Sequence, residues 1–102
     1  MATRPKTLAP VSPGEILAEH FIAGHRGLSA YRVALDMGLR PPVVYELISG
    51  KRSITAPLAL RLGRYFGTTP QFWIDLQSHY DLELAERALG KRVRKEVKPL
   101  AA

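Results

Sequence analysis

The chain has 102 residues and no cysteine, and its 46% hydrophobic and 24% charged residues are the composition of one globular domain. Disulfides and thiolate metal sites are therefore excluded, and no apolar run reaches the ~20 residues that span a bilayer. Because the N-terminus also lacks the apolar core of a secretory signal, we expect a cytoplasmic protein with no membrane partner.

The formal charge of +6 is unevenly distributed along the chain. Residues 29–66 carry six Lys/Arg against two Asp/Glu, residues 67–89 carry one against four, and residues 90–102 carry five against one. This distribution predicts one surface that suits a polyanion and another that does not. The alternative is uneven charge that is merely solvated.

The first predicted helix begins with the run SPGE at residues 12–15. Ser12 is a typical N-cap, Pro13 loses no hydrogen bond in a first turn, and Glu15 completes a capping box. The helix should end at the next pair of glycines. Residues 1–11 are expected to form a flexible N-terminal arm.

The second predicted helix begins after Ser29, another plausible N-cap, and ends at Gly38. Its inward-facing residues are expected to be Val33, Ala34 and Met37. A third helix follows the two adjacent prolines.

Since a residue before proline avoids the helical conformation, Arg40 and Pro41 should be extended, and the third helix should begin near Pro42. The helical period places three apolar residues on one face, which we expect to be buried. They are Val44, Leu47 and Ile48.

Two further helices complete the predicted fold. Thr55 caps the fourth, which ends at Gly67, and Thr69 opens the fifth, which should end at Gly90. The charged residues 91–102 are expected to be a basic flexible tail. No run alternates as a strand would, so the fold class is all-α.

The second and third helices have the pattern of a helix-turn-helix. Ala34 permits a close helix crossing, Gly38 suits the tight turn, and Val44 and Leu47 would hold the third helix on the second. A plain helical hairpin shows the same spacing by chance in some sequences.

If the motif binds DNA, the exposed face of the third helix enters the major groove, and cations at its ends meet phosphates. The prolines replace the polar side chains that usually read base edges, which leaves contact with thymine methyls through Pro42 or Val43, alongside Tyr45 and Glu46. Lys51 and Arg52 follow the helix and are expected to bind phosphate; a solvated loop pair is the alternative. The base-facing candidates are Arg40, Pro42, Val43, Tyr45, Glu46 and Ser49.

With these residues placed, the sequence resembles the HigA-type antitoxins of bacterial toxin–antitoxin operons, a phage-repressor-like (XRE) helix-turn-helix family. The matching blocks are PGEIL, LSAYRVA, RPP, GKRSIT, ALRLGRYFGTTPQFW and LQSHYDLELA, which together cover most of residues 12–89. The resemblance implies a compact five-helix domain over residues 12–90 that dimerises, binds a palindromic operator and represses its own operon. It also implies a HigB-like partner, a small mRNA-cleaving toxin that the antitoxin neutralises.

The resemblance also implies residue roles. Val43, Tyr45, Glu46 and Ser49 fall at base-facing or groove-lining positions. Lys51, Arg52 and Ser29, at the start of the second helix, fall at phosphate-contact positions. The family often has arginine where this chain has Val43 and asparagine where it has Tyr45, which leaves the operator sequence open.

Apolar residues on the fifth helix fit dimerisation, because aromatic residues are favoured at interface cores. We expect a dimer contact at Leu76, Tyr80 and Leu84. For Phe72 and Trp73, packing within the protomer is an equally good interpretation.

Residues for catalysis or for a cofactor are not gathered in the sequence. His20, His25 and His79 are scattered, without cysteines or clustered carboxylates that would complete a metal site. We expect that the protein is not an enzyme and binds no metal and no cofactor. Two alternatives to the antitoxin stay open, a stand-alone repressor without a toxin and an interaction module that has lost DNA binding.

Overall fold

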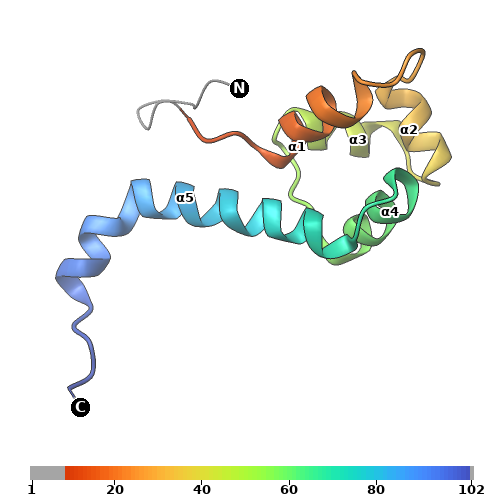
Figure 1. The fold of residues 1–102 in the computed structure, drawn as a ribbon. Helices are drawn as coiled ribbons and strands as arrows, with labels where there is room; N and C mark the ends of the chain where they lie inside the picture. The colour runs from red at the N-terminus through yellow and green to blue at the C-terminus, as the bar shows by residue number, and fades with distance from the viewer. Residues whose placement is uncertain (1–8, 102) are drawn as a thin grey trace.

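The computed structural model describes residues 9–101, which contain helices and no strand. Helix α1 runs directly into the short π-helix η1, and together they form the first predicted helix (Figure 1). The elements are α1 (Pro13–Ile16), η1 (Leu17–Ile22), α2 (Ala30–Asp36), α3 (Pro41–Ile48), α4 (Ala56–Phe66) and α5 (Pro70–Glu96). The all-α prediction is confirmed. Most of the expected N-terminal arm, residues 1–11, lies outside the described residues.

Side-chain caps begin three of the four helices for which the sequence predicts them. Thr55 is the N-cap residue of α4, but the predicted cap is wrong because its side chain makes no cap hydrogen bond. The hydroxyls of Ser12 and Ser29 accept hydrogen bonds from the backbone N–H groups of Glu15 at 3.2 Å and Arg32 at 3.1 Å. At the start of α5, Thr69 accepts from the N–H of Phe72 at 3.1 Å. Each bond satisfies one of the donors that a helix N-terminus leaves free.

The core lies where α1–η1, α2, α3 and α4 meet the first turns of α5 (Figure 1). Trp73 of α5 is fully buried there, and its indole N–H donates to the Thr68 hydroxyl at 2.7 Å. The other fully buried large side chains are Leu17, Val33, Val44, Leu47 and Leu62. Packing within the protomer is therefore the correct interpretation of Trp73.

Helix α5 is longer than predicted, because it continues through Gly90 to Glu96. The predicted end at Gly90 is wrong, since one glycine inside a helix costs only about 1 kcal/mol and good helix formers follow it. Ion pairs on the helix surface add to this, with Arg92 2.7 Å from Glu96 and Arg94 2.6 Å from Glu86.

Helix α3 also begins one residue earlier than predicted. Arg40 is the extended N-cap, as expected, but Pro41 already occupies the first helical position. Both prolines therefore lie in the first turn, where their missing N–H groups would have had no intrahelical partner.

Candidate nucleic-acid interface

Helix α3 is fixed on the body through the apolar face that the sequence predicts. Val44 and Leu47 are buried, Ile48 is half-buried, and Ala34 of α2 is fully buried where the two helices meet. Gly38 turns the chain between them with a φ of 72°, in the left-handed region that favours glycine. Across this turn, the N–H of Leu39 donates to the carbonyl of Ala34 at 2.8 Å. The second and third helices thus form a helix-turn-helix.

Two contacts that sequence analysis missed also hold α3 in place. A Cβ atom added to Gly14 would lie 1.7 Å from the carbonyl oxygen of Leu47, so α1 lies directly against the end of α3. On the other side, the Arg61 guanidinium of α4 donates to the carbonyl of Met37 at 2.7 Å, beside the Gly38 turn. The sequence does carry a signal for the contact between α1 and α3. Gly14 is a glycine inside a helical turn, at a position where no bend in the chain requires a glycine.

The outward face of α3 carries most of the base-facing candidates. Tyr45 is 52% exposed, and Arg40, Pro42 and Ser49 are exposed beside it. Val43 is half-buried and packs against the core cluster, so only part of its side chain lines this face. The face therefore offers the Arg40 guanidinium and the Tyr45 hydroxyl as hydrogen-bond donors, because the Ser49 hydroxyl already donates to the carbonyl of Glu46 at 3.2 Å.

Glu46 and Arg52 form an ion pair across the end of α3. The Arg52 guanidinium donates to one carboxylate oxygen of Glu46, with nitrogen–oxygen distances of 2.6 and 2.8 Å. A predicted base-facing residue and a predicted phosphate-facing residue thus engage each other. Since an exposed pair contributes at most about 1 kcal/mol, a phosphate can replace the carboxylate. Lys51 is exposed next to this pair.

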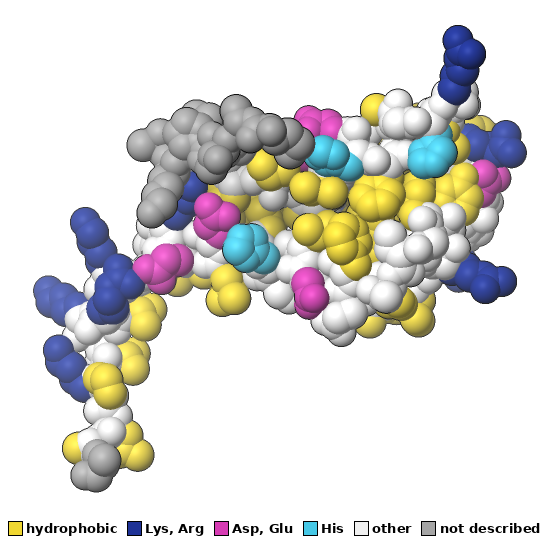
Figure 2. Space-filling view, viewed as in Figure 1, with side chains coloured by type: hydrophobic (Ala, Val, Ile, Leu, Met, Phe, Trp, Pro, Cys, Tyr) yellow, Lys and Arg dark blue, Asp and Glu magenta, His cyan; other side chains and the backbone are white. Residues whose placement is uncertain are grey.

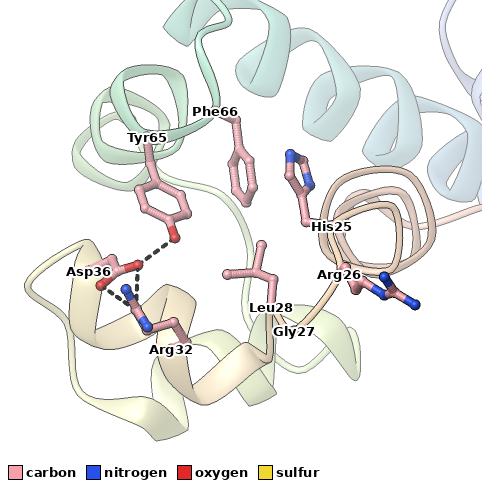
Figure 3. Close-up of a pocket in the computed structure, with 8 residues that line it drawn as sticks. All are labelled: His25, Arg26, Gly27, Leu28, Arg32, Asp36, Tyr65 and Phe66. Carbon is pink, nitrogen blue, oxygen red and sulfur yellow. Dashed lines mark hydrogen bonds and ion pairs between the residues drawn. The ribbon is translucent and has the colours of Figure 1, made fainter.

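The start of α2 lies beside an open groove of about 480 Å³ whose wall includes a hydrogen-bonded cluster (Figure 3). The Arg32 Nε donates to Asp36 at 2.9 Å, and the Tyr65 hydroxyl donates to the same carboxylate at 2.6 Å. The hydrogen bond from Tyr65 holds the pKa of the Asp36 carboxyl below its ordinary value, and Arg32 acts in the same direction. Accepting that bond, Asp36 raises the pKa of Tyr65. This cluster joins the end of α2 to α4.

The predicted dimer residues differ in exposure. Leu76 packs partly into the core of its own protomer, Tyr80 is half-buried, and Leu84 is 40% exposed. Beyond them, Figure 2 shows that α5 projects from the body, with Lys and Arg gathered on one side and hydrophobic side chains on the other. The exposed large hydrophobic residues towards the end of the chain include Leu89 and Val93 of α5 and Val97, which follows it.

Among residues 9–101, no group of His, Cys, Asp and Glu side chains is arranged to hold a metal ion. Within the same range, none of the helices has the length and apolar character that crossing a membrane requires.

Comparison with known proteins places this arrangement in context. A profile of the family described as Helix-turn-helix (HTH_3) matches residues 23–73, which include α2, α3 and α4. Virulence-associated protein I of Dichelobacter nodosus is 43% identical over 77 residues, which are 76% of this chain and 70% of that protein. Antitoxin HigA-1 of Vibrio cholerae is 38% identical over 73 residues, 72% of this chain and 68% of that protein.

A solved structure shares nearly the whole architecture. Pseudomonas aeruginosa antitoxin HigA, solved with the higBA promoter, superposes with a TM-score of 0.85 at 40% identity. The match covers 90% of this chain and 99% of that one, so it includes α5 as well as the helix-turn-helix.

Proposed function

The chain belongs to the HigA-type antitoxins of the helix-turn-helix family, and from that premise we propose that it is a cytoplasmic antitoxin and operator-binding autorepressor. In this role it neutralises a small RNA-cleaving toxin of the HigB type and performs no catalysis. The observation that carries the proposal is α3, a short helix held rigidly on one face and exposed on the other, in a chain 40% identical to a promoter-bound HigA.

On operator DNA, the exposed N-terminal positions of α3 enter the major groove. Arg40 and Tyr45 supply hydrogen-bond donors to base edges, and Glu46 accepts from a cytosine amino group. At the far end, the Ser49 hydroxyl donates to the carbonyl of Glu46, and its oxygen can accept from a base. Pro42 and the exposed part of Val43 contact thymine methyl groups.

Phosphates on either side of the groove position the helix. Lys51 meets one phosphate, and Arg52 exchanges its bond to Glu46 for another. Ser29 contacts the DNA backbone from its place at the start of α2, where its hydroxyl also caps the helix.

The operator-binding form is a homodimer, with contacts at Leu76, Tyr80 and Leu84 of α5. Its twofold axis places two copies of α3 about 34 Å apart, the spacing of successive major-groove faces. A palindromic operator matches this symmetry. The support is the exposed apolar surface of α5, which no other part of the described chain covers.

Two measurements test the proposal. The chain should shift DNA from its own promoter at lower concentration than shuffled DNA of the same length, and binding should weaken steeply with salt. Co-expression of this chain with a neighbouring toxin-like gene should restore the growth that the toxin alone inhibits, and the two proteins should co-purify. Promoter binding without any toxin rescue would indicate a stand-alone repressor, and loss of both would contradict the proposal.

A further inference from the structure

Gln77 of α5 is a buried polar residue whose side chain joins two parts of the molecule. It is only 9% exposed, although glutamine usually lies at the surface. Its Oε1 accepts the backbone N–H of Ile54 at 2.8 Å, and its Nε2 donates to the carboxylate of Asp81 at 2.9 Å. The two bonds use both ends of the amide, and they fix which end faces Ile54.

The bond to Ile54 connects α5 with the segment that follows the recognition helix. Residues 49–55 leave α3 and carry Lys51 and Arg52, the two cations placed above at phosphates. Ile54 is itself buried, so its N–H has no easy access to water when Gln77 is replaced. One side chain of α5 therefore helps to set the position of this segment, together with the bond from the Lys51 N–H to the carbonyl of Glu46 at 2.9 Å and the ion pair of Arg52 with Glu46.

The same place adjoins the proposed dimer contact. A groove of about 240 Å³ lies between the start of α1, residues 49–55 and α5. Arg52 and Ser53 line one side, and Gln77, Tyr80 and Leu84 line the other. A partner seated on Tyr80 and Leu84 would thus lie close to the amide that holds the phosphate-contact segment.

We propose that Gln77 is a positioning residue for DNA binding, which sets residues 49–55 on α5 so that Lys51 and Arg52 reach phosphates. Asp81 orients the Gln77 amide by accepting the hydrogen bond from its Nε2. The inference rests on the proposed operator binding and adds a link between that surface and the helix of the dimer contact.

The first test replaces Gln77→Met, which keeps an unbranched side chain of similar length and removes both hydrogen bonds. Operator affinity should fall about tenfold, because an N–H left buried without a partner is costly and the segment must move to satisfy it. The slope of log affinity against log salt should become shallower by about 1 for each cation that no longer reaches its phosphate, and by about 3 to 4 if Lys51 and Arg52 of both protomers are displaced. Binding is measured by fluorescence anisotropy at a temperature where circular dichroism shows each variant fully folded.

The decisive test exchanges the amide and the carboxylate between positions 77 and 81. Gln77→Glu alone keeps an acceptor for the Ile54 N–H but sets two carboxylates against each other, so affinity should fall about tenfold. Adding Asp81→Asn supplies an amide donor to the new carboxylate and keeps the net charge of the wild type. The double variant should return to within about twofold of wild-type affinity, with the wild-type salt slope.

Two results would overturn the inference. In the first, folded Gln77→Met binds with wild-type affinity and slope. In the second, Gln77→Met does not fold, and Gln77→Glu with Asp81→Asn binds no better than Gln77→Glu alone. Wild-type binding to promoter DNA is measured first. Its absence would contradict the proposed function, whereas unaffected variants beside a binding wild type would contradict only the role of Gln77.

Discussion

Helix α3 and the projecting end of α5 both expose side chains, but the molecule supports them very differently. The body holds α3 from three sides, through the apolar contact with α2, the close approach of Gly14, and the anchored segment after it. Beyond Gln77, the only buried residue of α5 is Gly90. A helix that reads a groove needs a fixed orientation, whereas a helix that adds an assembly surface can be exposed until its partner arrives.

The largest expected effect is at the contact that orients α3. Gly14→Val should destabilise the fold by more than about 3 kcal/mol, because α1 must move away from the backbone of α3. Chemical denaturation followed by circular dichroism measures this change. Gly24→Val is the matched control, since the nearest atom outside its own neighbourhood is 3.7 Å from an added Cβ. Equal losses of stability in the two variants would show that the close approach is unimportant.

The two ends of α5 provide the next comparison. Trp73→Ala should cost about 3–5 kcal/mol, because it empties a fully buried site and removes the hydrogen bond to Thr68. Val93→Ala, in the exposed part, should change the stability of the protomer by less than about 0.5 kcal/mol. Both are measured by denaturation at low protein concentration. A large destabilisation by Val93→Ala there would mean that the projecting end contributes to the fold of the protomer.

The phosphate-contact cations should affect binding and leave stability nearly unchanged. Lys51→Ala with Arg52→Ala should weaken binding to every DNA sequence and make the salt slope shallower by about 1 for each cation removed from a phosphate. Tyr45→Ala should instead change the preference among sequences. Anisotropy titrations on operator and shuffled DNA separate the two patterns, and a uniform decrease in affinity for Tyr45→Ala would contradict its base-facing role.

The smallest expected effect concerns pH. The folded chain lowers the pKa of Asp36, so this carboxylate contributes stability above its ordinary pKa of 3.8 and loses the contribution as pH falls through the lowered value. Tyr65→Phe removes the main cause of the shift, and the variant should lose less stability than wild type as pH falls below about 4. Thermal unfolding between pH 2 and 7 measures the difference. Parallel curves for the two proteins would contradict this role of Tyr65.

Local signals predicted much of the fold. Ser12, Ser29 and Thr69 cap helices as expected, and the helical period placed Val44 and Leu47 in the core. These features depend on residues a few positions apart, where backbone geometry determines which side chains meet.

The remaining features depend on contacts that are distant in the sequence. The Gly14 approach to α3 and the bond from Ile54 to Gln77 join residues whose proximity is created only by packing. The pairing of Glu46 with Arg52 depends on how the chain leaves α3. The sequence predicts an end of α5 at Gly90 because glycine often ends a helix, but Lys, Arg and Glu continue the helix beyond it.

The central claim is that α3 and the cations beside it form a DNA-binding surface on a symmetric dimer. The most direct measurement is a salt titration of the full-length chain on its own promoter and on shuffled DNA. Four phosphate-contact cations, two from each protomer, predict a slope of about −3 to −4 for log affinity against log salt, and tighter binding to the promoter at every salt concentration. Equal affinity for both DNAs, or affinity that does not change with salt, would contradict the claim.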